Sequence, residues 1–251
     1  MARKITGSLF VSLDGVIQAP GGPTEDPTNG FDEGGWLFKL PDDGVNQTLG
    51  ELFGGAYDLL LGRRTYDIFA AYWPYVEGPE AALGKAFSHA NKYVLTGNNA
   101  PLPWENSHRL TDWEEVAKLK ESEGPDLIVQ GSGSIYPGLL DAGLLDRLIL
   151  ITYPVILGRG KRWFGAETPA RKLDMIDHYV TDKGTIIASF APGGDLPAYP
   201  ADALTPSTSD REAERPARIA HCTWHASYTT RTPPTTHYTT VPSLPSPAHN
   251  N

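Results

Sequence analysis

Two consecutive arginines stand where a buried strand would turn into a helix. Residues 59–61 are a leucine triplet, Gly62 follows them, and Arg63, Arg64 and Thr65 come next. A helix N-terminus offers unpaired backbone N–H groups and the positive end of the helix dipole, and both hold phosphate. Guanidinium groups add forked, charge-assisted hydrogen bonds. These residue types at this spacing predict a site for a phosphate-bearing ligand, and we expect a nucleotide.

Two further turns of the same kind follow apolar runs, at 96–99 and at 131–134. In an open α/β sheet, ligands lie beyond the carboxyl ends of the strands, where glycines admit phosphate and hydroxyls donate to it. Each turn alone is a common tight turn, and an arginine pair alone is often solvated surface. The three together predict one dinucleotide site. Two adjacent arginines favour NADP(H) over NAD(H), and the spacing matches neither a Rossmann fingerprint nor a P-loop.

The elements that would position these turns alternate along the chain. Asp42 and Asp43 are candidate caps for the first helix and Thr111 for a later one. Residues 14–41 form a long Gly/Pro-rich loop, a length that usually marks function or disorder. We predict strands over 4–13, 57–61, 92–96, 126–130 and 144–156, a closing hairpin of 173–181 and 185–190, and helices ending near 53, 72, 90, 122 and 142. Alternating strands and helices predict a mostly parallel α/β sheet with an antiparallel edge.

Composition bounds the class of protein. The chain has 251 residues, of which 40% are hydrophobic, a formal net charge of −9 and a pI near 5.2. This acidic balance disfavours nucleic acid as a partner. The single cysteine, Cys222, is too few for a disulfide framework or a cysteine-rich zinc site, so we expect no metal and a cytoplasmic location. We expect no membrane contact, because no run approaches the ~18 apolar residues of a span.

The chain changes character near Gly193. Residues 193–251 hold nine of the 22 prolines, many serines and threonines, and few aliphatic residues. Such a composition buries too little apolar surface to offset chain entropy. We therefore predict one domain over 1–192 and a disordered Pro/Ser/Thr-rich segment over 193–251, with a non-native or misread C-terminus as the alternative. His221, Cys222 and His225 in that segment are too few for a metal prediction.

Five motifs in a fixed order span most of residues 4–190, at 12–17, 61–66, 129–136, 144–148 and 154–160. With this set the chain resembles the dihydrofolate reductase superfamily, in the branch of the reductase domain of the bifunctional riboflavin-biosynthesis deaminase/reductase. The resemblance implies a dihydrofolate reductase-like fold, with helices on both faces of the sheet. It also implies NADPH as cofactor, 5-amino-6-(5-phosphoribosylamino)uracil reductase activity and a homodimer. The His-x-Glu and Pro-Cys-x-x-Cys zinc motif of the deaminase half is absent.

The resemblance also assigns site residues by their match to the family motifs. Arg63, Arg64 and Thr65, which follow Gly62, would hold the 2′-phosphate and pyrophosphate. Thr96 and Gly97 would flank the adenosine, while Ile17 and Gln18 would lie near the nicotinamide on a loop that closes over it. Family members often have two glycines where this chain has Gly131 and Ser132. The pyrophosphate and nicotinamide ribose would be lined by Gly131, Ser132, Gly133, Ser134, Ile135 and Tyr136.

The substrate side is less specific. Reduction of C=N or C=O needs a proton, and Asp43 is the candidate acid because the order of Trp36 and Asp43 loosely resembles a dihydrofolate reductase pattern. Helix capping is the alternative role of Asp43. Trp36 would either anchor the long loop in the core or stack on a planar substrate. Riboflavin-type relatives can use an acidic residue where this chain has Gln130, which weakens the case for a riboflavin intermediate.

Three functional hypotheses follow from these residues. The first is an NADPH-dependent reductase of a small, pterin-like or riboflavin-precursor-like heterocycle. The second is an NADP(H)-binding protein without turnover, such as a sensor or structural dimer, which the lack of a clear acid keeps open. The third is a dihydrofolate reductase proper, against which the altered spacing between Trp36 and Asp43 counts.

Overall fold

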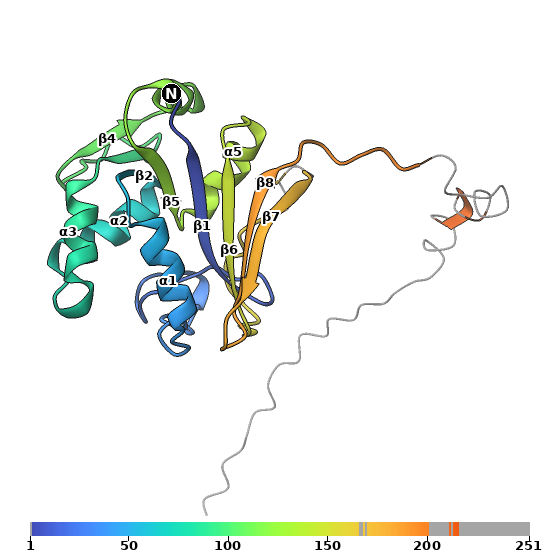
Figure 1. Ribbon diagram of the computed structural model, residues 1–251, viewed down its shortest axis with the longest axis horizontal. Coiled ribbons are helices and arrows are strands. Elements are labelled where there is room, and N and C mark those ends of the chain that lie inside the picture. The colour runs from blue at the N-terminus through green and yellow to red at the C-terminus, as the bar shows by residue number, and fades with distance from the viewer. Residues whose placement is uncertain (1, 166–167, 169, 201–210, 212, 216–251) are drawn as a thin grey trace, which may run out of the picture. The chain divides into compact units, whose positions relative to one another are not determined.

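Eight strands form one sheet (Figure 1), within the part of the chain that the computed structural model describes, residues 2–165, 168, 170–200, 211 and 213–215. All neighbouring strands are parallel except where the last strand of the chain pairs. That strand runs antiparallel to both of its neighbours and forms the C-terminal hairpin with one of them. In sheet order the strands are β4 (Ser107–Leu110), β3 (Lys92–Leu95), β2 (Tyr57–Gly62), β5 (Asp126–Gln130), β1 (Ile5–Ser12), β6 (Arg147–Tyr153), β8 (Ile186–Pro192) and β7 (Leu173–Val180).

Helices cover both faces of this sheet because its central strands are apolar on both sides. Leu59 and Leu61 of β2 pack with the residues of one face, and Leu60 between them packs with those of the other. One face is covered by α1 (Asp43–Leu52), α2 (Arg63–Tyr72) and α3 (Ala81–His89), and the other by α4 (Trp113–Glu121) and α5 (Tyr136–Asp141). The predicted α/β class, the mostly parallel sheet and the closing hairpin are confirmed.

Of the two expected caps of the first helix, Asp42 is the one observed, and the cap of α4 lies one residue after the expected position. Asp42 caps α1, since its Oδ1 accepts hydrogen bonds from the N–H groups of Gly44 (3.0 Å) and Val45 (3.4 Å). Asp112 rather than Thr111 caps α4 and accepts from the N–H of Glu115 (2.9 Å). In each case a carboxylate in extended backbone satisfies N–H groups of the first turn.

Two strands also differ from expectation. β4 was not expected at all, because its four residues are largely polar and it pairs only with β3 at the edge of the sheet. The strand expected over 144–156 spans only 147–153. Leu144 and Leu145 belong to the turn after α5 and pack into the core from there, which explains their apolar character.

The chain divides into two compact units, Met1–Pro197 and Ala198–Asn251. In the second unit, the described residues 211 and 213–215 are helical. The predicted segment 193–251, including His221, Cys222 and His225, falls largely outside the described residues, so its predicted disorder stays a prediction. All site residues predicted above belong to the first unit.

Candidate functional site

β3, β2 and β5 are neighbouring parallel strands, so their carboxyl ends lie side by side (Figure 1). The three predicted turns follow these strands and therefore meet at the carboxyl end of the sheet. Hydrogen bonds join two of the turns directly. The N–H of Gly62 donates to Ser132 Oγ (3.0 Å), and the N–H of Ser132 donates to Thr65 Oγ1 (3.1 Å). The turn after β2 and the turn after β5 therefore form one continuous surface at the first turn of α2.

The turn after β5 has an unusual backbone. Gly131 (φ 68°) and Ser132 (φ 55°) are both left-handed, and this conformation is strained for serine by about 1–3 kcal/mol. The Ser132 side chain is fixed by its bond to Gly62, which holds the strained residue in place. A Cβ on Gly133 would lie 2.2 Å from Ile17 Cδ1, so a larger residue there would displace the end of the Ile17 side chain. Strain of this kind concentrates at ligand sites.

Arg63 joins the turn after β3, at residues 96–99, to the start of α2. Its Nε donates to both carboxylate oxygens of Asp67 (2.9 Å each), and its terminal nitrogens donate to the carbonyls of Ala100 (3.0 Å) and Pro101 (3.3 Å). The pairing with Asp67 raises the pKa of the Arg63 guanidinium. This arginine is therefore largely committed to holding the 96–101 turn against α2.

Arg64 points towards the long loop and keeps free donors. Its side chain is 54% exposed, and its Nη2 donates to Asp26 Oδ1 and to Thr28 Oγ1 (3.2 Å). The first turn of α2, all of which the structure describes, contains no acidic residue and no side-chain cap. Four features accordingly fit a phosphate group here: helix N–H groups, a half-exposed guanidinium, hydroxyls and a left-handed turn.

Gln18 holds the long loop against the site. Its Nε2 donates to the carbonyls of Asp26 (2.9 Å) and Thr28 (3.0 Å), and its Oε1 accepts from the N–H of Lys161 (2.9 Å). The side chain is 3% exposed, so Gln18 is buried among backbone groups. Ile17 beside it packs on Gly133, which places the loop over the turn where the resemblance expects the nicotinamide.

The remaining predicted cofactor residues are spread between surface and core. Gly97 and Ser134 are exposed, whereas Thr96 is buried and its Oγ1 accepts from the N–H of Asn98 (3.1 Å). Ile135 is buried in the core cluster between β5 and α5. Tyr136 is fully buried and donates to the carbonyl of Val129 (2.9 Å), so its phenol belongs to the core.

Trp36 and Asp43 occupy very different surroundings. The Trp36 indole is 1% exposed, donates to the carbonyl of Gln18 (2.9 Å) and packs edge-on against Tyr153 (5.6 Å between ring centres). Of its two expected roles, the structure displays that of a core anchor. Asp43 is exposed, and the capping role falls to Asp42. Burial would raise the pKa of Asp42, but hydrogen bonds from Thr181 and its neighbours hold that pKa below its usual range.

Ser8 and Gln130 form a buried polar pair that no motif in the sequence connects. They are partners in the parallel register of β1 and β5, so their side chains share one face of the sheet. Ser8 Oγ and Gln130 Oε1 are buried, and neither has a hydrogen-bond partner among the described residues. The strand order reverses direction between β5 and β1, where open α/β sheets bind their ligands.

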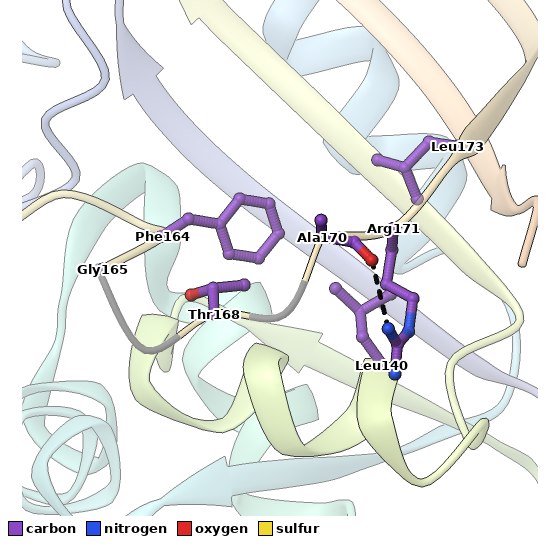
Figure 2. Close-up of a pocket in the computed structure, with 7 residues that line it drawn as sticks. All are labelled: Leu140, Phe164, Gly165, Thr168, Ala170, Arg171 and Leu173. Carbon is purple, nitrogen blue, oxygen red and sulfur yellow. Dashed lines mark hydrogen bonds between the residues drawn. The ribbon is translucent and has the colours of Figure 1, made fainter. Parts of the chain in front are cut away.

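Two shallow hollows are lined by residues outside the three turns. One, of about 290 Å³, is lined by Trp36, Leu40 and residues 155–157, together with Glu33 and Lys39. The other, of about 260 Å³, surrounds Phe164 and Leu140 beside α5 (Figure 2). Figure 2 shows the Arg171 guanidinium hydrogen-bonded to the carbonyl of Ala170 (3.1 Å), and the same side chain donates to Asp141 Oδ1 (3.0 Å).

Neither a metal centre nor a membrane span is visible in the described part of the chain. No group of three or more His, Cys, Asp or Glu side chains there is arranged to hold a metal ion. No described helix is long and apolar enough to cross a bilayer.

The fold and the three joined turns are those of an α/β protein whose ligand site lies beyond its strand ends. The chain belongs to the RibD C-terminal domain family, whose model matches residues 3–187. This assignment confirms the resemblance to the riboflavin-type reductase branch.

The chain is similar to several curated proteins and to solved structures. Among curated proteins, YyaP of Bacillus subtilis is 28% identical over 190 residues, covering 73% of this chain and 92% of that protein. YwjB of the same organism is 26% identical over 180 residues, covering 69% and 89%. A structure from Shewanella sp. PV-4, assigned to riboflavin biosynthesis, is 19% identical with a TM-score of 0.56 and covers 76% of this chain and 99% of that one.

A longer structure shares the same fold. The diaminohydroxyphosphoribosylaminopyrimidine deaminase/5-amino-6-(5-phosphoribosylamino)uracil reductase of Thermotoga maritima is 15% identical, with a TM-score of 0.51. The match covers 76% of this chain and 57% of that one. At these identities the two structures establish the fold alone.

Proposed function

We propose that this protein is an NADPH-dependent reductase that transfers a hydride to a C=N or C=O bond of a small heterocycle resembling a riboflavin precursor. One observation carries the proposal: Arg64, the first turn of α2 and the strained turn at Ser132 lie together at the carboxyl end of the sheet. Membership of the RibD C-terminal domain family supports the same chemistry. When bound, the nicotinamide would supply the hydride.

The protein's own residues would bind and orient the reactants. Arg64 and Thr65 would hold phosphate with charge and hydroxyl, while Arg63 keeps the adenosine-side turn in place through Ala100 and Pro101. Ile17, packed on Gly133, would exclude water from the reacting edge of the nicotinamide. Thr96, Gly97, Ser134, Ile135 and Tyr136 stay predicted cofactor neighbours.

The substrate would bind on the α1 side of the sheet, near Ser8 and Gln130. Their unpartnered oxygens are suited to a planar ligand that carries N–H donors, because each would gain the hydrogen bond that it lacks. Asp43, at the exposed start of α1, stays the candidate proton donor, and Trp36 stays a predicted neighbour of the substrate through the loop that it anchors.

The direct test measures the binding of NADPH and NADH by fluorescence or calorimetry. It compares wild type with Arg64→Ala and Arg159→Ala. Loss of charge-assisted hydrogen bonds should weaken NADPH binding to Arg64→Ala by about 10-fold or more. Arg159 is the control because its 67% exposed side chain pairs with Asp32 in the same loop region. No NADPH binding by wild type would overturn the cofactor assignment. Binding without oxidation across pterins, flavin precursors and imines would favour a sensor.

A cytoplasmic homodimer is part of this proposal. The support lies in the hairpin of β7 and β8, where β7 is an edge strand and Met175, Ile176, Val180 and Ile186 are 43–59% exposed. An exposed edge strand with apolar side chains is suited to contact with a second copy.

A further inference from the structure

One carboxylate lies between two cations at the edge of the candidate nucleotide site. Asp26 Oδ1 accepts from Arg64 Nη2, and Asp26 Oδ2 accepts from Lys161 Nζ (2.7 Å). Thr28 adds two donors to Oδ1, its N–H (3.2 Å) and its hydroxyl (2.5 Å). The Asp26 side chain is 7% exposed, whereas those of Arg64 and Lys161 are 54% and 36% exposed. The anion is thus buried and its cations face solvent.

The backbone around this cluster is fixed from both sides. Gln18 bonds the carbonyl of Asp26 and the N–H of Lys161, and the N–H of Ile17 donates to the carbonyl of Lys161 (2.9 Å). The long loop (residues 14–41) and the backbone at Lys161 are therefore joined to each other beside α2. Asp26 and Lys161, 135 residues apart in sequence, are held at a fixed place relative to Arg64.

We propose that Arg64 and Lys161 form a phosphate subsite and that Asp26 is its internal counter-anion, which occupies the subsite until a phosphate group displaces it. This inference rests on the proposed nucleotide-binding function and adds two residues to it. A carboxylate and a phosphate both present adjacent oxygens that accept from guanidinium and ammonium groups. Phosphate carries the greater charge and also matches the helix N-terminus, so it competes effectively for the same donors.

This arrangement has a consequence for affinity. A ligand that must first displace Asp26 binds only to the fraction of molecules in which the cations are free, and its apparent affinity is lowered by that fraction. The half-exposed ion pairs are individually weak, so the reduction is modest. Removing the carboxylate while keeping the side-chain shape should therefore tighten phosphate binding.

The experiment compares Asp26→Asn with wild type in binding NADPH, NADH and inorganic pyrophosphate by calorimetry. We expect the dissociation constant for NADPH to fall by about 3- to 10-fold. A gain with all three ligands assigns the subsite to the diphosphate, and a gain with NADPH alone assigns it to the 2′-phosphate. Lys161→Met in the Asp26→Asn background should weaken binding by about 10-fold, because Lys161 then has the ligand as its anion.

Asp14→Asn is the matched control. Asp14 lies in the same loop and faces Arg162 (3.7 Å), but its hydrogen bonds come from Ser12 and from the N–H groups of Leu157 (3.1 Å) and Gly158 (2.8 Å). Weaker binding by Asp26→Asn than by wild type, or a Lys161→Met variant that binds as tightly as its parent, would overturn the subsite. Asp26→Ser replaces Asp26→Asn if the latter does not fold. Failure of wild type to bind NADPH would instead count against the proposed function, and the pyrophosphate titration would still test the subsite.

Discussion

The Ser8 hydroxyl gives a prediction that separates stability from function. Ser8 is completely buried in β1, and its Oγ has no hydrogen-bond partner among the described residues. A buried hydroxyl without a partner costs about 1–3 kcal/mol of desolvation. Ser8→Ala removes that hydroxyl and leaves a small apolar side chain. The free energy of unfolding of this variant should therefore be about 1–2 kcal/mol higher than that of wild type, which raises Tm by roughly 2–8 °C for a domain of this size.

Ser12 in the same strand provides the control. It is 1% exposed, but its Oγ donates to Asp14 Oδ1 (2.7 Å) and accepts from the N–H of Val16 (2.8 Å). Ser12→Ala leaves the N–H of Val16 without this partner and removes one of the donors to Asp14, so it should lower stability by about 1–3 kcal/mol. Urea denaturation and scanning calorimetry measure both variants on one scale, after two-state behaviour has been checked.

The two serine variants must change stability in opposite directions. If Ser8→Ala lowers the free energy of unfolding as Ser12→Ala does, Ser8 Oγ has a partner in the folded protein. The proposal that a substrate satisfies this hydroxyl would then lose its support. If Ser8→Ala is more stable, the same variant should also show a lower kcat/KM with any accepted substrate, because the hydrogen bond to the ligand is gone.

Two further predictions concern the core and the edge of the sheet. Lys92 is fully buried, and its Nζ donates to the carbonyls of Phe87 (3.1 Å) and Ser88 (2.7 Å). Burial lowers the pKa of Lys92 to about 8, so the unfolded chain binds more protons between pH 8 and 10.5 and stability rises with pH in this range. Relative to Lys92→Met, wild type should gain about 2 kcal/mol in urea denaturation between about pH 7.5 and 9.5, and a constant difference would contradict the assignment. Val180→Lys on exposed β7 should convert a dimer to a monomer in sedimentation velocity, with Asp182→Lys in the adjoining turn as control, and a monomeric wild type would rule out the dimer.

The architecture was predictable where local pattern and tertiary packing agree. The leucine triplet of β2 is apolar on both sides because helices cover both faces, so the sequence shows a buried parallel strand directly. β4 has no such pattern, and only its pairing with β3 makes it a strand. The expected strand 144–156 was too long because apolar character alone does not separate a strand from a core-packed turn.

The candidate site was predictable in its turns and not in its long-range partners. Arg63 and Arg64 stand out by type and by their place after an apolar strand, yet the sequence does not say that Asp67 engages one and Asp26 the other. Lys161 directly follows the 154–160 motif, but its contact with Asp26 depends on the packing of the long loop through Gln18. Contacts between residues so far apart in sequence depend on the tertiary fold, and the periodicity of the sequence does not predict them.

Charged side chains are arranged differently at the two ends of the sheet, and the difference supports the proposed ligand site independently of any relative. At the amino end, Arg3 and Asp58 form an ion pair with side chains 1% and 5% exposed, and Asp58 also accepts from the N–H and Nδ2 of Asn91 (3.0 Å each). That pair is closed to solvent, so its role is structural. At the carboxyl end the anion Asp26 is buried while Arg64 and Lys161 stay open to solvent. Cations that keep accessible donors beside a helix N-terminus are able to exchange their partner for a phosphate, which a sealed ion pair does not permit.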